Sequence, residues 1–153
     1  MKILVDADSC PKEARELILR RAAKLGLRII LAANRQIPFS SVVPEKVEMI
    51  ICPKEDNSAD DRIFELAEGG DLVLTRDVPL AKRLVEKGVF VFDDRGRVFT
   101  KDNINELLSL RNFTVGLADN GLGIERITNY GKKELKKFAD SLDRILTKRV
   151  NGT

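Results

Sequence analysis

Histidine is absent from the 153 residues, and cysteine occurs only at Cys10 and Cys52. Without histidine the chain cannot form a Ser-His-Asp or Cys-His nucleophile system, use a histidine general base or bind a metal through imidazole. Two cysteines are too few for a four-thiolate zinc site, and we expect both to be reduced and buried. Any chemistry therefore depends on carboxylates, amines, hydroxyls or thiols.

Long apolar runs are also lacking. None approaches the roughly 20 residues of a membrane-spanning helix, and Lys2 leads directly into Ile3-Leu4-Val5 without a cleavable signal pattern. We therefore expect a cytoplasmic protein that does not bind membranes. Hydrophobic residues make up 43% of the chain and charged residues 33%, which suits a globular core with a charged surface. The length predicts a single domain over residues 1–150.

The basic charge is concentrated near the end of the chain. Lysine and arginine number 27 and aspartate and glutamate 24, for a net charge of +3. Residues 126–149 alone carry eight basic and three acidic side chains, a local charge of +5. A basic helix at about 132–149 suits a polyanionic partner, with Lys132, Lys133 and Lys136 as candidate phosphate contacts. A solvated amphipathic helix with a lysine-rich outer face explains the same pattern.

Apolar runs and amphipathic segments alternate along the chain. Strands are expected at 2–5, 28–33, 47–52, 71–75 and 89–92, with a short extension at 98–100. Helices are expected from Pro11 to Gly26, from Asp60-Asp61 to Gly69-Gly70, from 78 to Gly88, from a capping signature at Asn103 and Glu106, and at 132–149. Segments 34–44 and 121–131 are expected to be irregular. The pattern predicts a three-layer α/β/α sandwich around a mainly parallel sheet of about five strands.

Aspartates gather where the predicted strands end. Asp6 and Asp8 follow the first strand, Asp77 follows the fourth, and Asp60 and Asp61 open the helix between the third and fourth. Ligands of parallel α/β sheets bind at the carboxyl ends of the strands. Carboxylates brought together there repel one another unless a cation lies among them, and oxygen ligands favour Mg²⁺ or Mn²⁺. These five aspartates are therefore the predicted metal ligands.

Helix capping is the competing explanation for the same residues. Asp8 or Ser9, Asp60 and Asp77 all stand just before or at the start of a predicted helix, where a carboxylate or hydroxyl accepts from free N–H groups. There are more carboxylates than capping requires, because Asp6 with Asp8 and Asp60 with Asp61 supply two where one cap suffices. This surplus favours the metal hypothesis.

Other polar residues near the same strand ends are candidate substrate contacts. They are Ser9, Asn34, Thr75, Arg76 and Lys82. The hydroxyl groups suit a phosphate oxygen or a metal-bound water, and the two cations can offset phosphate charge. Each also has a local explanation as a capping, turn or surface residue.

Several of these motifs together resemble a known family. They are Val5-Asp6-Ala7-Asp8-Ser9-Cys10-Pro11, Asn34, Ala59-Asp60-Asp61, the segment DLVLTRDVPLA at 71–81, Arg95-Gly96 and Arg111-Asn112-Phe113. In this order they resemble the YaiI/YqxD family of bacterial proteins, from Met1 to about Phe113 and again in the final helix. The segment 121–133 departs from the family, whose members tend to be proline-rich and richer in arginine there.

That resemblance implies a PIN-like fold, whose better-known members are metal-dependent ribonucleases and structure-specific nucleases with clustered acidic residues. It places Asp6 at the acidic position after the first strand, Asp60 or Asp61 at the helix position, and Asp77 at the Thr-x-Asp position. Asp93 lies outside this core set. The implied cofactor is Mg²⁺ or Mn²⁺, and the implied partner is RNA.

Three functions remain open from the sequence. The first is a metal-dependent nuclease acting on RNA, with Asp6, Asp61 and Asp77 as its catalytic residues. The second is an aspartate-nucleophile phosphatase, because residues 3–9 and Phe92-Asp93-Asp94 resemble haloacid-dehalogenase-like motifs. The third is a non-catalytic nucleic-acid-binding module in which the aspartates only cap helices.

Overall fold

The computed structural model describes residues 1–37, 47–54, 58–119 and 130–150. The strands are β1 (Lys2–Asp6), β2 (Arg28–Ala33), β3 (Val47–Ile51), β4 (Leu72–Leu74), β5 (Phe90–Phe92) and β6 (Val98–Phe99). The helices are α1 (Lys12–Leu25), α2 (Ser58–Leu66), α3 (Val78–Lys87), α4 (Ile104–Asp119) and α5 (Lys132–Val150). The predicted irregular segments 34–44 and 121–131 lie largely outside the described residues.

Within the described residues, one sheet of six strands in the order β3-β2-β1-β4-β5-β6 forms the centre of the fold. The first five strands of this order are parallel, and β6 pairs antiparallel with β5. The mainly parallel sheet is therefore confirmed, and the predicted extension at 98–100 supplies its sixth strand. The chain adds β2 and β3 on one side of β1 and then crosses to place β4 on the other side.

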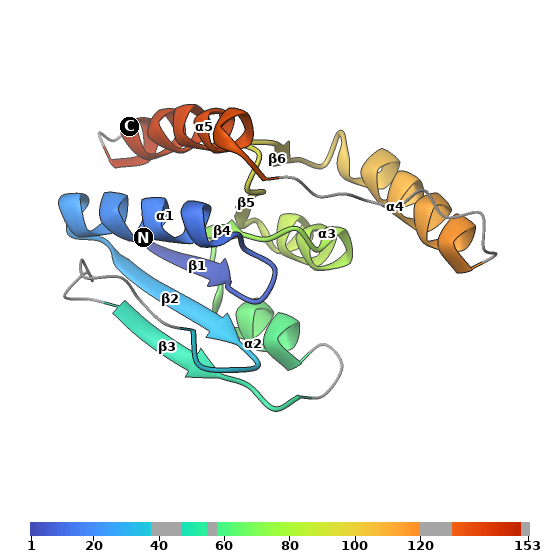
Figure 1. The fold of residues 1–153 in the computed structure, drawn as a ribbon, viewed down its shortest axis with the longest axis horizontal. Helices are drawn as coiled ribbons and strands as arrows, with labels where there is room; N and C mark the ends of the chain where they lie inside the picture. The colour runs from blue at the N-terminus through green and yellow to red at the C-terminus, as the bar shows by residue number, and fades with distance from the viewer. Residues whose placement is uncertain (38–46, 55–57, 120–129, 151–153) are drawn as a thin grey trace.

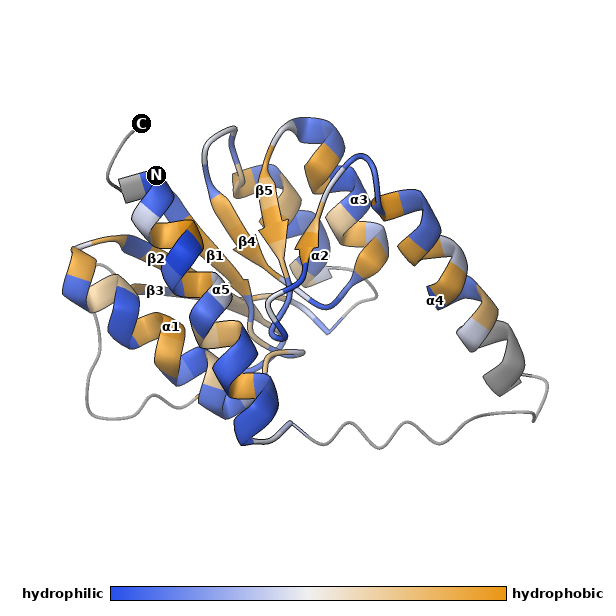
Figure 2. Cartoon of the chain, turned by 90° about the horizontal axis from the view of Figure 1, so that it is seen from above, coloured by the Kyte–Doolittle hydropathy of each residue, from blue (hydrophilic) through white to orange (hydrophobic). Residues whose placement is uncertain are grey.

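Helices cover both faces of this sheet, so the predicted three layers are confirmed (Figure 1). On one face, Ile3 and Val5 of β1 belong to a core that includes the buried sides of α1 and α5. Leu4 points the opposite way and packs in a second core with α2, α3 and the start of α4. Hydrophobic residues predominate along the strands and alternate with hydrophilic residues along the helices (Figure 2).

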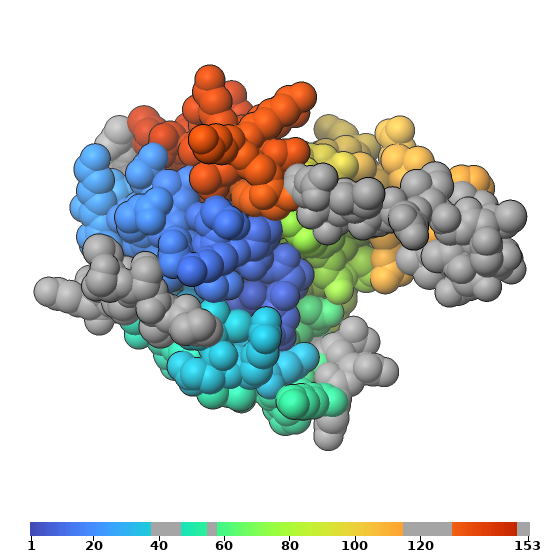
Figure 3. Space-filling view, viewed as in Figure 1, coloured from blue at the N-terminus to red at the C-terminus, as the bar shows by residue number. Residues whose placement is uncertain are grey.

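The apolar stripe predicted for the last helix is buried. Phe138 and Leu142 are fully buried, and the Phe138 ring stacks on Phe92 with 6.1 Å between ring centroids. The same helix lies against α1, and the two meet on the molecular surface (Figure 3). No helix within the described ranges is long and apolar enough to cross a membrane.

Two helix ends and one helix start show how local chemistry sets the boundaries. Gly26 and Gly88 close α1 and α3 with φ angles of 68° and 90°, left-handed values that glycine adopts without strain. The sequence predicts that Asn103 and Glu106 cap the start of α4, but the Asn103 side chain forms other hydrogen bonds. Its Oδ1 accepts from the Thr100 backbone N–H at 2.8 Å and its Nδ2 donates to the Val98 carbonyl at 2.9 Å, so it closes the turn before α4.

The glycine at the β5–β6 turn provides a test of how closely α5 packs. Gly96 has a φ of 84°, and a Cβ placed there would lie 2.7 Å from the Lys137 carbonyl oxygen and 2.8 Å from the Ser141 Cβ. Gly26 has a similar φ of 68° but open space around it. Gly26→Ala should therefore cost about 1–2 kcal/mol of left-handed strain, and Gly96→Ala a further ~1–3 kcal/mol from overpacking. Urea unfolding midpoints compare the two, and equal losses would contradict the close packing of α5.

Candidate metal centre

The predicted aspartates gather where the strand order reverses. β1 lies between β2 and β4, and its last residue, Asp6, is paired in register with Ala32 of β2. On the other side Val5 is opposite Leu74, so Thr75 and Asp77 leave β4 beside Asp6. Such a reversal opens a crevice at the carboxyl ends of the strands, which is where open α/β sheets bind their ligands.

Asp6 is buried, with 6% of its surface exposed, and two hydroxyl groups hold it. Thr75 Oγ1 and Ser9 Oγ donate to the same oxygen, Asp6 Oδ2, at 3.0 and 3.1 Å. Within the described part of the chain, Asp6 Oδ1 accepts no hydrogen bond. Burial raises the pKa of Asp6, the two hydroxyl bonds lower it, and the charges of Asp77 and Asp8 raise it, with a net increase. One carboxylate oxygen is thus fixed and the other is free to bind a ligand.

Asp60 and Asp77 bring two further carboxyl groups to the same place. Asp60 stands in the first turn of α2, and its carboxyl group lies within hydrogen-bond reach of that of Asp77. The pKa of Asp60 is raised to about 7. Burial is the largest cause, followed by the charge of Asp77, the hydrogen bond with Asp77, and the charges of Asp6 and Asp61. The three carboxyl groups of Asp6, Asp60 and Asp77 therefore repel one another across one site; we call them the acidic cluster.

Capping explains part of this arrangement. Asp77 does cap α3, because its Oδ1 accepts from the Leu80 N–H at 2.9 Å. The residue before α1 is Pro11, which makes no side-chain cap, so neither Asp8 nor Ser9 caps that helix. Asp6 ends a strand and caps nothing. The capping hypothesis therefore accounts for one oxygen of Asp77 and leaves the convergence of the carboxylates unexplained.

A cleft of about 260 Å³ opens beside the acidic cluster. Its rim is polar: Asp8 Oδ2 accepts from the Asn34 backbone N–H at 2.7 Å, and Ser58 Oγ donates to Asn34 Oδ1 at 3.4 Å. The lining residues are Asp6, Asp8, Ser9, Asn34, Ser58, Ala59 and Asp60. Of the predicted substrate contacts, Ser9 and Asn34 thus line the cleft, and Thr75 lies beneath it as the partner of Asp6.

Asp61, which the sequence predicts to be catalytic, lies outside the acidic cluster. Its carboxylate is exposed and accepts from Arg83 at 3.0 Å on the outer side of the helices. Ala59 and Ile63 turn one side of α2 toward the core, and each residue rotates about 100° around a helix axis. Asp61 is therefore carried about 200° from Ala59, away from the sheet, and Asp60 occupies the position facing Asp77.

The remaining predicted contacts are spread over other surfaces. Arg76 is ion-paired with Asp94. Lys82 is partly buried on α3 and is not among the residues lining the cleft. Exposed positions on α5 hold the basic candidates Lys132, Lys133 and Lys136. The Tyr130 hydroxyl donates to the Asp94 carbonyl at 2.6 Å and fixes the start of α5 next to the end of β5.

Asp93 and Asp94 stabilise the turn after β5. Asp93 Oδ1 accepts from the backbone N–H groups of Arg95 and Arg97, both at 2.9 Å, and Asp93 Oδ2 pairs with the Arg97 side chain. Asp94 is buried and paired with Arg76. Both carboxylates are therefore satisfied locally.

Two features of the site had no clear signal in the sequence. Ser58 lines the cleft, but a serine at the start of a helix is an ordinary capping residue. Arg15 is buried on α1 with 8% of its surface exposed, and its Nε has no hydrogen-bond partner in the part of the chain described. Near it, Cys10 is a free thiol whose pKa burial raises to about 12, and Cys52 is also free and buried, as expected.

The donors of the acidic cluster are of the type that Mg²⁺ and Mn²⁺ prefer. Across the residues described, no three carboxylates or thiols are already close enough to enclose an ion by themselves. Mg²⁺ commonly binds through one or two carboxylates, keeps several waters and meets phosphate oxygens of a substrate. Asp6 with Asp60 or Asp77 fits that mode, whereas a fully protein-enclosed ion does not fit.

Repulsion within the acidic cluster predicts a stabilising substitution. At pH 8 without divalent metal, Asp60→Asn should unfold at higher temperature than Asp61→Asn, because only the former removes a charge facing Asp6 and Asp77. Both variants lose one charge from the first turn of α2, so their helix-dipole losses match. The expected gap is about 1 kcal/mol or more, given ~1.4 kcal/mol per unit of pKa displacement. Thermal denaturation measures it, and a less stable Asp60→Asn would show that these carboxylates do not repel.

Comparison with known proteins identifies the family. The model of a family described as "Uncharacterized BCR, YaiI/YqxD family" matches residues 4–148. A UPF0178 protein of Treponema denticola is 48% identical over 150 residues, covering 98% of this chain and 94% of its own length. For UPF0178 proteins of Treponema pallidum and Pseudomonas entomophila the identities are 44% and 40%, over 97% and 99% of this chain and 82% and 100% of theirs.

Among solved structures, a crystal structure of Rae1 (YacP) from Bacillus subtilis aligns with a TM-score of 0.40 and 19% identity, over 95% of this chain and 99% of that chain. The sequence motifs, the family model and the relatives agree: the chain belongs to the YaiI/YqxD family.

Proposed function

We propose that the protein is a divalent-metal-dependent nuclease that hydrolyses phosphodiester bonds in RNA. The observation that carries this proposal is the convergence of Asp6, Asp60 and Asp77 from β1, α2 and the start of α3 beside a polar cleft. Keeping like charges together without a cation is unfavourable, and a site of this kind is useful when a cation and a phosphate enter it. The resemblance to PIN-like nucleases supports the same function.

Asp6 is the central ligand of this proposal. Thr75 and Ser9 fix its Oδ2, which leaves Oδ1 for Mg²⁺ or Mn²⁺. Asp60 or Asp77 would complete the protein's share of the ligands, with Asp8 at the rim. Asp6 with Asp60 or Asp77 would hold the ion, which when bound would supply activation of water and neutralisation of phosphate charge.

The catalytic set that we propose is therefore Asp6, Asp60 and Asp77, with Asp60 in the place first given to Asp61. The neutral donors around the cleft have separate tasks. The Ser58 hydroxyl and the Asn34 amide lie at the rim, where they can orient phosphate oxygens without adding charge. Thr75 acts as a positioning residue, since it is bonded to Asp6 and also accepts from the Asp77 N–H at 3.0 Å.

RNA is proposed as the substrate on the resemblance to PIN-like ribonucleases, and exposed cations on the same edge of the fold support the binding of a nucleic-acid backbone. The contact between Tyr130 and Asp94 brings the start of α5 to the carboxyl ends of the strands. Lys132 and Lys133, in the first turn of this helix, can bind backbone phosphates beyond the cleft. Such contacts track the backbone and do not select bases.

The phosphatase alternative receives less support from the geometry. Asp93, which would act in its last motif, is occupied by the β5–β6 turn. A phosphatase of this kind would also need a lysine to hold the phosphate, and Lys87 lies at the far end of α3 and donates to the Phe64 carbonyl at 2.5 Å. The scheme also gives no role to Asp60 or Asp77.

The nuclease proposal is tested by RNA cleavage with matched charge variants. With Mn²⁺ or Mg²⁺, the wild type should cleave a mixed panel of single-stranded and structured RNAs, and EDTA should stop it. Asp77→Asn keeps a capping oxygen for the Leu80 N–H but loses the charge, so cleavage should fall at least about a hundredfold. Asp61→Asn removes a neighbouring exposed carboxylate and should retain cleavage.

The outcomes separate the hypotheses. If the protein binds RNA without cleaving it, and neither divalent metal nor Asp77→Asn changes the affinity, the non-catalytic binding module is favoured. Equal loss in Asp61→Asn and Asp77→Asn would contradict the assignment of Asp60 in place of Asp61.

A further inference from the structure

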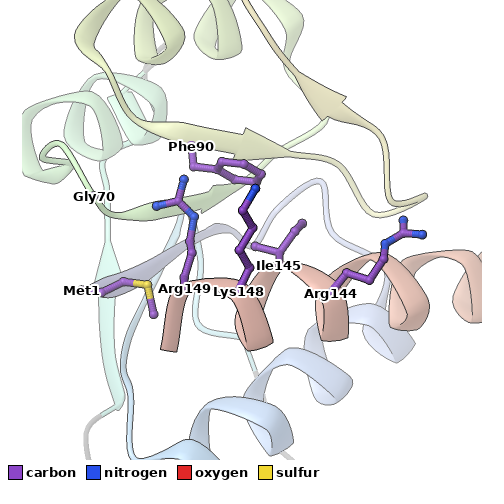
Figure 4. A pocket seen from close by; sticks show the side chains of 7 residues that line it. All are labelled: Met1, Gly70, Phe90, Arg144, Ile145, Lys148 and Arg149. Atoms are coloured by element: carbon purple, nitrogen blue, oxygen red, sulfur yellow. The ribbon is translucent and has the colours of Figure 1, made fainter. Parts of the chain in front are cut away.

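A second cleft lies at the opposite edge of the sheet from the acidic cluster. It has a volume of about 570 Å³, inside the range of about 300–1,000 Å³ common for small-molecule sites. One wall comes from the amino-terminal ends of strands, with Met1 before β1, Gly70 before β4 and Phe90 at the start of β5. The facing wall is the last part of α5 (Figure 4). We call it the basic cleft.

Its charged lining is entirely cationic among the described residues. Arg144, Lys148 and Arg149 line it, and none of the three has a carboxylate partner in the described part of the chain. Figure 4 shows their side chains rising from the same side of α5. Asp143 of this helix lies elsewhere and binds Arg21 of α1 at 2.8 Å. Asp143 therefore faces α1 and not the basic cleft.

Asp71, at the strand ends that line the cleft, does not cancel this charge. Asp71, next to Gly70, is buried and accepts from Lys2 Nζ at 2.6 Å and from the Glu68 N–H at 2.9 Å. Burial opposes ionisation of Asp71, but these bonds outweigh it and the pKa falls below the ordinary value. The Asp71 charge is therefore compensated by Lys2 and leaves the basic cleft positive.

Interaction with the helix dipole does not explain all three cations of the basic cleft. Lys148 and Arg149 belong to the last turn of α5, where cations interact favourably with the helix dipole. Arg144 stands well before that turn. The Arg149 guanidinium also leans over the Phe90 ring, 4.3 Å from its centroid, which directs it across the cleft.

The uncharged lining is apolar. Ile145 is 8% exposed and forms the floor between Arg144 and Lys148 in Figure 4, while Met1 and Phe90 supply a thioether and an aromatic surface. Several cations favour a phosphate, with which arginine makes paired hydrogen bonds. The apolar and aromatic walls favour a flat organic group. A ligand that carries both a phosphate and a flat organic group would match both parts of the lining.

We propose that the basic cleft binds a nucleotide, with its phosphate on Arg144, Lys148 and Arg149 and its base against Met1, Ile145 and Phe90. The nucleotide is either free or part of a nucleic-acid strand, since both present the same phosphate and base. β1 separates this cleft from Asp6 by about 15 Å, at ~3.3 Å per residue. The site does not depend on the metal centre or on the proposed nuclease activity.

The test is calorimetry in EDTA, which removes any binding through a metal at the acidic cluster. The probes are adenosine 5′-monophosphate, adenosine, inorganic phosphate, and a short single-stranded RNA. The double variant Arg144→Gln/Lys148→Gln removes two cations from the cleft. Its control, Arg20→Gln/Lys137→Gln, removes one arginine and one lysine that are exposed on α1 and α5 outside the cleft.

Adenosine 5′-monophosphate should bind the wild type and the control more tightly than adenosine or phosphate, and the affinity should fall at least tenfold in the cleft variant. That result supports a free nucleotide. Binding of the RNA alone, with the same loss in the cleft variant and not in the control, supports a strand of nucleic acid. The proposal would be overturned if neither adenosine 5′-monophosphate nor the RNA bound, or if the cleft and control variants bound them with equal affinity. This holds whether or not the protein cleaves RNA.

Discussion

The Thr75 hydroxyl is the contact on which the candidate site depends. It donates to Asp6 Oδ2 and accepts from the Asp77 N–H, so it links the end of β1 to the start of α3. The pairing of Val5 with Leu74 sets the register of β1 and β4, which places Thr75 within hydrogen-bond distance of Asp6. Asp6 is held at a buried position while Asp77 is turned toward α2, where Asp60 meets it. The carboxylates thus converge because the parallel register and one buried hydroxyl place them there.

This arrangement gives the sheet two chemically different edges. At the carboxyl ends of the strands, Asp6 of β1, Asp8 after it and Asp60 of α2 line a small polar cleft. At the amino ends, cations of α5 face an aromatic residue and a larger opening. Because α5 runs antiparallel to the central strands, its first turn reaches the acidic edge and its last turn the basic edge. A single helix therefore contributes basic side chains to both surfaces.

Much of the fold follows from local patterns in the sequence. Gly26 and Gly88 predict the ends of α1 and α3 because left-handed backbone favours glycine. The stripe containing Phe138 and Leu142 predicts the buried side of α5 by its spacing alone. The Asn103 interaction could not be predicted in this way, because its side chain bonds backward to Thr100 and Val98, and that choice depends on the preceding turn.

The structure brings together three of the aspartates that the sequence singles out, Asp6, Asp60 and Asp77, and turns Asp61 away from them. The strand ends point to Asp6 and Asp77, but Asp60 and Asp61 are adjacent and equally acidic, so composition does not choose between them. A usable signal was present: Asp60 stands three and four residues before Ile63 and Phe64, on the apolar stripe of α2 that faces the core. The partners of Arg76 and Arg97 could not be predicted, because they depend on how the β5–β6 turn folds back on the sheet.

The proposed divalent-metal site joins Asp6 to Asp60 and Asp77, and Mn²⁺ calorimetry on the wild type, Asp60→Asn and Asp61→Asn tests it. The wild type and Asp61→Asn should bind Mn²⁺ with similar affinity, and Asp60→Asn should bind it at least about tenfold more weakly. Weakened binding in Asp61→Asn with wild-type affinity in Asp60→Asn would rule out this set of ligands, as would a wild type that binds no Mn²⁺ either alone or with a non-cleavable RNA.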